Sequence, residues 1–120
     1  GQVFKGGFVV YSNEAKSKLV KVSQKTLQEQ GAISAQCAEE MASNTQQLLG
    51  TDLAISFTGN AGSTTQENKP VGLVYIGLAI KGALISKEYQ FFGSRREIRR
   101  QAVETGIILI KDNISLLKNN

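Results

Sequence analysis

Histidine is absent from this 120-residue sequence, and cysteine occurs only once, as Cys37. A single cysteine excludes an internal disulfide bond, and without histidine a zinc site lacks nearly all of its usual ligands. Ser-His and Cys-His catalysis are excluded as well. Any acid-base chemistry must therefore use a lysine, a carboxylate or a tyrosine. We expect no metal site, and we interpret Cys37 as a small apolar helix residue and not as a reactive thiol.

Long hydrophobic runs are also missing. No stretch approaches the roughly 18 apolar residues of a membrane-spanning helix, and no signal-peptide pattern opens the chain. The apolar content of 41% and the charged content of 20% are ordinary for a soluble globular protein. These features predict one cytoplasmic domain over residues 1–120. The net charge of +4 suits an anionic small molecule such as a phosphate and does not require nucleic acid.

The hydrophobic pattern and the capping residues predict an alternation of helices and strands. Apolar runs predict strands over residues 8–11, 53–57, 71–80 and 84–91. Helical spacing predicts helices over residues 14–20 and 26–30, a third helix capped by Ser34 that runs to residue 49, and a fourth from a capping box at residues 94–97 to residue 117. This order indicates a layered α/β domain with a mixed β-sheet flanked by helices.

Several ordered segments carry a resemblance to a known family. The first reads FKGGFVVYSNEAK over residues 4–16, and the second reads TGNAG over residues 58–62 followed by KPVG over residues 69–72. GAIS and Met41-Ala42 stand between them, and GSRREIR follows at residues 93–99. In this order the segments resemble the C-terminal domain of the CinA family of competence/damage-inducible proteins, which includes nicotinamide-nucleotide amidohydrolases. The resemblance implies that residues 1–120 form a single, incomplete domain of that type.

The resemblance implies a reaction and its catalytic residues. The reaction is hydrolysis of the carboxamide of nicotinamide mononucleotide to nicotinate mononucleotide and ammonia, without a metal or organic cofactor. Lys16 is implied as the general base of a Ser-Lys mechanism, and Tyr11 is implied to relay or orient the proton. By residue type alone, Lys16 is a solvated helix lysine and Tyr11 a core aromatic at a strand end, so both readings stay open.

Substrate binding is assigned to three places along the chain. A loop that follows a strand is a usual site of ligand contact, and its glycines let the backbone approach a ligand. An arginine in the first turn of a helix can reach a phosphate. A connecting turn and a solvated helix face are the alternatives. The residues assigned to substrate binding are Asn13, Thr58, Gly59, Ala61, Gly62, Lys69 and Arg96.

The sequence departs from the family pattern at the implied nucleophile. The resemblance places a catalytic serine three residues before Phe4, where this chain has Gly1, and the helix-strand-helix segment that precedes it in the family is not in this sequence. Because glycine has no side chain to attack a carboxamide, we expect negligible amidase activity from this chain as it stands, and an amidohydrolase if the full-length form carries the serine. The rival interpretation is a non-catalytic module that keeps the fold to bind a nucleotide or to dimerise.

Two further patterns concern partners. Four arginines at residues 95, 96, 99 and 100 follow Phe91 and Phe92, a pattern that suits either nucleic acid, as in a competence factor, or a solvated helix face. We expect a small pyridine nucleotide as the partner, and neither nucleic acid nor a membrane.

The apolar run at residues 106–110 leaves the last helix without one polar face, so it must pack on the sheet or on a second subunit. We therefore expect a homodimer that buries this helix or an exposed strand.

Overall fold

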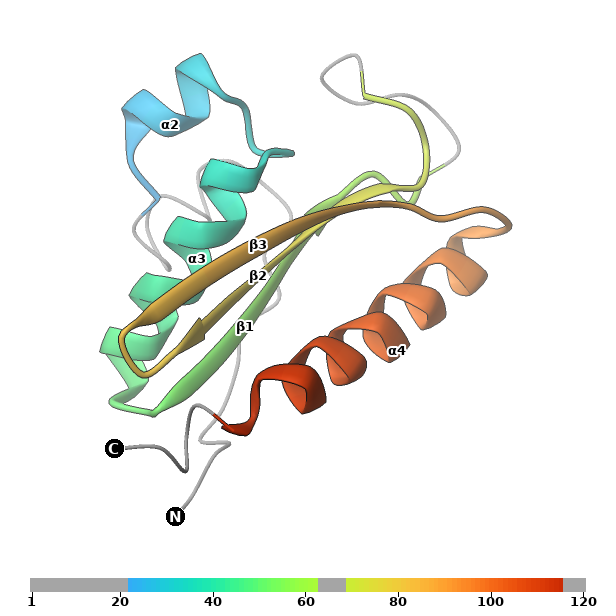
Figure 1. Ribbon diagram of the computed structural model, residues 1–120. Coiled ribbons are helices and arrows are strands. Elements are labelled where there is room, and N and C mark those ends of the chain that lie inside the picture. The colour runs from blue at the N-terminus through green and yellow to red at the C-terminus, as the bar shows by residue number, and fades with distance from the viewer. Residues whose placement is uncertain (1–21, 63–68, 116–120) are drawn as a thin grey trace.

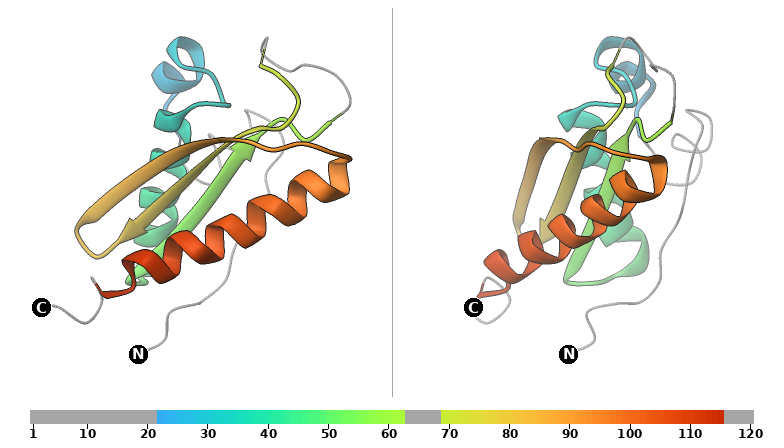
Figure 2. Two further views of the ribbon diagram at one scale, coloured as in Figure 1. Left: turned by 45° about the vertical axis from the view of Figure 1, so that its right-hand side comes forward. Right: turned by 90° about the vertical axis from the view of Figure 1, so that its right-hand side faces the viewer.

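The computed structural model describes residues 22–62 and 69–115. A three-stranded sheet has one long helix packed on each of its faces, and a shorter helix lies beside one of these two helices (Figures 1 and 2). The predicted strand over residues 8–11 and the predicted helix over residues 14–20 fall outside the described residues. The described elements are α2 (Gln24–Glu29), α3 (Ala35–Leu49), β1 (Leu53–Gly59), β2 (Leu73–Ile80), β3 (Ala83–Gln90) and α4 (Arg95–Asn113).

The sheet has the strand order β1-β2-β3, and both of its pairings are antiparallel. Phe57 of β1 pairs with Ile76 of β2, which pairs in turn with Lys87 of β3. The two-residue connection between β2 and β3 favours this arrangement, since a parallel pair needs a long crossover. The parallel pairing that a mixed sheet requires is not among the strands of residues 22–62 and 69–115.

One face of the sheet packs against α4. The even-numbered residues of β2 from Val74 to Ile80 form the main core with Ile98, Ala102 and Leu109 of the helix. The helix approaches β1 closely at Gly106, where an added Cβ would lie 2.7 Å from the Phe57 ring. The predicted packing of the apolar stretch on the sheet is thus confirmed for Gly106 and Leu109, whereas Ile107 and Ile108 are exposed.

The other face packs against α3 through small side chains. The Ser56 hydroxyl donates a hydrogen bond of 2.6 Å to the Ala38 carbonyl. A Cβ at Gly77 would lie 2.3 Å from the same carbonyl, so only glycine fits between β2 and the helix. A second core cluster, which includes the fully buried Cys37, joins α2 to α3. The prediction of Cys37 as a packed helix residue is confirmed.

Local capping residues set the helix ends. Ser34 accepts from the Cys37 amide at the start of α3, and Gly50 ends that helix at a φ of +60°. Ser94 and Glu97 form the predicted capping box of α4. Ser23 caps α2, which therefore starts two residues earlier than predicted. In the part of the chain that the structure describes, no helix has the length and apolar character needed to cross a membrane.

Candidate functional site

The antiparallel sheet brings most of the predicted binding segment to one edge. Gly59, at the end of β1, pairs with Val74 near the start of β2, and Leu73 pairs with Gln90 at the end of β3. The helix α4 begins just beyond β3, and the start of α3 reaches the same edge (Figure 1). We call this edge, formed by residues 58–62 and 69–72, the turn edge.

Asn60 organises the turn edge from within. It is only 3% exposed, its side-chain amide donates to the Lys69 carbonyl at 3.3 Å, and its side-chain oxygen accepts from the Gly62 amide at 3.1 Å. Its backbone nitrogen donates to Leu73 and its carbonyl accepts from Gly72. The sequence assignment omits Asn60, although an asparagine two residues before a glycine is typical of a turn closed by its own side chain.

Two glycines let neighbouring backbones approach at this edge. A Cβ on Gly59 would lie 2.6 Å from the Leu73 carbonyl oxygen. Gly72 has a φ of +93°, and a Cβ there would lie 2.0 Å from the Phe91 carbonyl oxygen. The Phe91 amide also donates to the Gly72 carbonyl at 2.8 Å. Gly72 of the turn edge is therefore in close backbone contact with the end of β3.

Thr58 joins the turn edge to the segment just before α3. Its side chain is 3% exposed, and its hydroxyl donates to the Ala32 carbonyl, just before α3, at 2.5 Å. Ala61 packs against the main core, while Gly62 and Lys69 are half-buried. Four predicted binding residues thus lie together at the turn edge, namely Gly59, Ala61, Gly62 and Lys69. The fifth, Thr58, is buried with its hydroxyl on Ala32. Their contact with a substrate stays a prediction.

Positive charge surrounds the start of α4. Arg95 and Arg96 are exposed in its first turn, where the amide ends of the peptide dipoles also favour an anion. Hydrogen bonds from the Ser94 backbone and side chain hold the pKa of Glu97 below its usual value. The start of α3 reaches the turn edge as well, through the bond from Thr58 to Ala32. The arginines thus place positive charge at the start of α4, and the Glu97 carboxylate, which accepts from the Ser94 amide, places a negative charge in the same turn.

The remaining predicted residues, Tyr11, Asn13 and Lys16, lie outside the described residues. Among residues 22–62 and 69–115, no group of three or more cysteine or carboxylate side chains is arranged to hold a metal ion.

The sheet with a helix on each face and a fixed turn at one edge define a layered α/β domain. Residues 1–114 match the CinA C-terminal domain, and the chain belongs to this family.

The relatives carry the name competence-damage inducible protein. The chain is 46% identical over 113 residues to the protein of Pediococcus pentosaceus and 50% identical over 103 residues to that of Clostridium novyi. It spans about a quarter of the length of these relatives, 27% and 25% respectively, and 93% and 84% of this chain is covered.

Solved structures of the family share the fold. The crystal structure of a competence/damage inducible protein from Agrobacterium tumefaciens matches with a TM-score of 0.83 at 34% identity, over 92% of this chain and 67% of that one. The corresponding protein of Klebsiella pneumoniae matches with a TM-score of 0.84 at 29% identity, over 88% of this chain and 66% of that one.

Proposed function

We propose that this chain is part of a nicotinamide mononucleotide amidohydrolase. The observation that carries the proposal is the turn edge, where a backbone turn fixed by Asn60 lies at the sheet edge where α4 also begins. A fixed turn beside the exposed arginines at the start of α4 suits the phosphate of a mononucleotide. The choice of carboxamide chemistry rests on the resemblance of residues 4–16 to the family's amidohydrolases.

The proposed reaction divides amide hydrolysis into two steps. A serine hydroxyl attacks the carboxamide carbon while Lys16, in its neutral form, takes the hydroxyl proton. Lys16 then gives the proton to the departing nitrogen, and ammonia leaves an ester that water hydrolyses to nicotinate mononucleotide. A lysine can act this way only if burial or a neighbouring cation lowers its pKa toward neutrality. Tyr11 is assigned to the relay between the two groups.

Substrate recognition is assigned to one residue of the turn edge and one residue of α4. Lys69 is half-buried beside the Asn60 side chain, and Arg96 is exposed in the first turn of α4. We assign the positive charge of both side chains to the phosphate of the substrate. Lys87 lies in the middle of β3, outside the turn edge, and is exposed. It is therefore the control lysine for the binding experiment.

Gly1 favours a second candidate, a nucleotide-binding module without catalysis. Glycine at the position implied for serine removes the nucleophile but leaves the turn edge intact. Such a module binds the mononucleotide and does not release ammonia.

Binding and turnover are measured separately. In calorimetry with nicotinamide mononucleotide, we expect Lys69→Gln and Arg96→Gln to weaken binding about tenfold each, and Lys87→Gln to leave it unchanged.

In an ammonia assay, we expect negligible release from the unchanged chain and measurable release from Gly1→Ser. Adding Lys16→Ala to Gly1→Ser should lower turnover by about 10²–10⁴, and Tyr11→Phe by less.

Each outcome separates the candidates. Near-normal turnover after Lys16→Ala removes Lys16 from the mechanism. Ammonia release by the unchanged chain well above a no-protein control would show that the reaction does not require a serine at position 1. Binding of the mononucleotide with no release from Gly1→Ser favours the non-catalytic module, and no binding at all contradicts both candidates.

A further inference from the structure

Two adjacent phenylalanines that follow β3 have opposite environments. Phe91 packs against the main core, and its ring stacks on that of Tyr89 with the ring centroids 5.6 Å apart. Phe92 is 74% exposed, the largest exposed fraction among the large apolar side chains of the described residues. One exposed apolar side chain is common at a protein surface, so only its surroundings can indicate a function.

The backbone around Phe92 is hydrogen-bonded on both sides. Before it, the Gln90 side-chain amide donates to the Val71 carbonyl of the turn edge at 2.9 Å. After it, the Gln101 side-chain amide of α4 donates to the Phe92 carbonyl itself at 2.7 Å. Side-chain bonds therefore connect this loop both to the turn edge and to α4, and the exposed ring belongs to a segment whose backbone is bonded in place.

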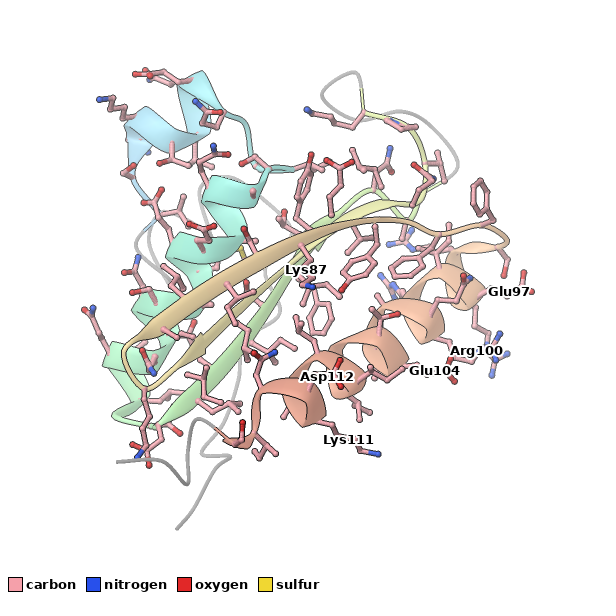
Figure 3. All side chains as sticks on the ribbon, viewed as in Figure 1. Lys87, Glu97, Arg100, Glu104, Lys111 and Asp112 are labelled. Carbon is pink, nitrogen blue, oxygen red and sulfur yellow. The ribbon has the colours of Figure 1, made fainter. Side chains whose placement is uncertain are left out.

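Gly93 leads the chain from Phe92 into α4. It has a φ of +117°, and an added Cβ would lie 2.7 Å from a carboxylate oxygen of Glu97. Figure 3 shows Glu97 at the beginning of α4, beside the loop that comes from β3. Arg95 and Arg96 are exposed in the same turn of the helix. The exposed ring is therefore next to charges of both signs.

The proposed substrate has two ends of opposite charge. Its phosphate is an anion, whereas its nicotinamide ring is bonded to the ribose through the ring nitrogen and is a pyridinium cation. Arginine side chains bind a phosphate and repel a pyridinium. The face of an aromatic ring attracts a cation that lies within about 6 Å of its centre. An exposed phenylalanine beside exposed arginines therefore suits the end of the substrate that the arginines cannot bind.

We propose that Phe92 stacks on the pyridinium ring of the mononucleotide and makes the site prefer the cationic ring over an uncharged one. This inference rests on the proposed function, and it adds a specificity residue to the same site. Phe92 takes no part in proton transfer or in attack on the carboxamide. Its contribution is to binding, and the expected size of a cation–π contact at an exposed site is a few-fold in affinity.

A single tryptophan can report the contact, because the chain contains no tryptophan. An indole stacked on a pyridinium ring loses its fluorescence, since the cation accepts an electron from the excited indole. In Phe92→Trp, we expect nicotinamide mononucleotide to quench the fluorescence and the quenching to saturate as the site fills. Leu48→Trp is the matched control, because Leu48 is 58% exposed near the C-terminal end of α3. It should show only collisional quenching, which rises in proportion to concentration.

The charge of the ring is tested with a second ligand. Reduced nicotinamide mononucleotide has the same ribose, phosphate and carboxamide, but its ring is uncharged. In calorimetry, we expect the unchanged chain to bind the oxidised form about fivefold more tightly than the reduced form. Phe92→Leu should bind the two forms within about twofold of each other, and Phe92→Tyr should keep the preference, because tyrosine retains the aromatic face.

Circular dichroism verifies that each variant folds. Three results would each overturn the proposal and leave the proposed function in place: binding by calorimetry without saturable quenching in Phe92→Trp, equal saturable quenching in Leu48→Trp, or an unchanged preference for the oxidised form in Phe92→Leu. The absence of any binding of nicotinamide mononucleotide to the unchanged chain would instead contradict the proposed function, and this inference with it.

Discussion

Single hydroxyl groups fix much of the geometry of this domain. Ser56 and Thr58 of β1 are both buried and donate to backbone carbonyls, Ser56 to Ala38 in the first turn of α3 and Thr58 to Ala32 just before it. A buried hydroxyl of this kind stabilises the fold by about 1 kcal/mol and is costly to leave without a partner. These two bonds hold the helix against the sheet where the turn edge begins.

Tyr75 carries a prediction at the same scale. Its hydroxyl donates to the Glu88 carboxylate at 2.7 Å, and this hydrogen bond, with burial and the Glu88 charge, raises the pKa of Tyr75 from 10.0 to about 12. Because the folded pKa is above the unfolded one, the stabilising effect is complete below pH 10 and is lost as the pH rises through 12. We expect Glu88→Gln to lower the Tyr75 pKa, measured by the ultraviolet absorbance of tyrosinate.

A control assigns that titration to its residue. Tyr75→Phe should remove the transition near pH 12, whereas Tyr89→Phe should leave it in place, because burial and Asp112 raise the pKa of Tyr89 by a separate route. An unchanged titration curve in Glu88→Gln would show that the carboxylate does not set the Tyr75 pKa.

At the scale of elements, the contact between α3 and β2 depends on a missing side chain. An added Cβ at Gly77 would meet the Ala38 carbonyl at 2.3 Å, and neither backbone can yield easily. We expect Gly77→Ala to lower the free energy of unfolding by about 1–3 kcal/mol, measured by urea denaturation. Gly82→Ala is the control, since nothing lies within 4 Å of a Cβ at that turn. Equal stability of the two variants would contradict this close approach.

The whole molecule carries a net charge of +4, and four of its basic residues stand at the start of α4. All four arginines are exposed, and Phe92 beside them is 74% exposed. We expect weak, sequence-independent binding of single-stranded oligonucleotides that falls steeply between about 50 and 200 mM salt. Fluorescence anisotropy measures it, with Arg95→Gln/Arg99→Gln as the variant that should bind less. Tight binding of one defined oligonucleotide at physiological salt would make nucleic acid the primary partner.

Local sequence was sufficient for most element boundaries. Ser34 and Gly50 bound α3, and Ser94 and Glu97 begin α4, because a cap satisfies backbone groups within a few residues of itself. The apolar runs placed all three described strands to within two residues, and the resemblance in residues 4–16 and 58–99 identified the family. The C-terminal end of β1 was predicted two residues too early, because Thr58 and Gly59 were assigned to the loop and belong to the strand.

Tertiary contacts were needed for the rest, because they join residues that are distant along the chain. The sequence pattern did not indicate that Thr58 faces Ala32, that Asn60 holds Lys69, or that Ile107 and Ile108 face away from the sheet while Gly106 and Leu109 face it. The direction of a side chain depends on which surface its element packs against. In α4, the packed face includes Gly106, which lies close to Phe57, a residue 49 positions away along the chain.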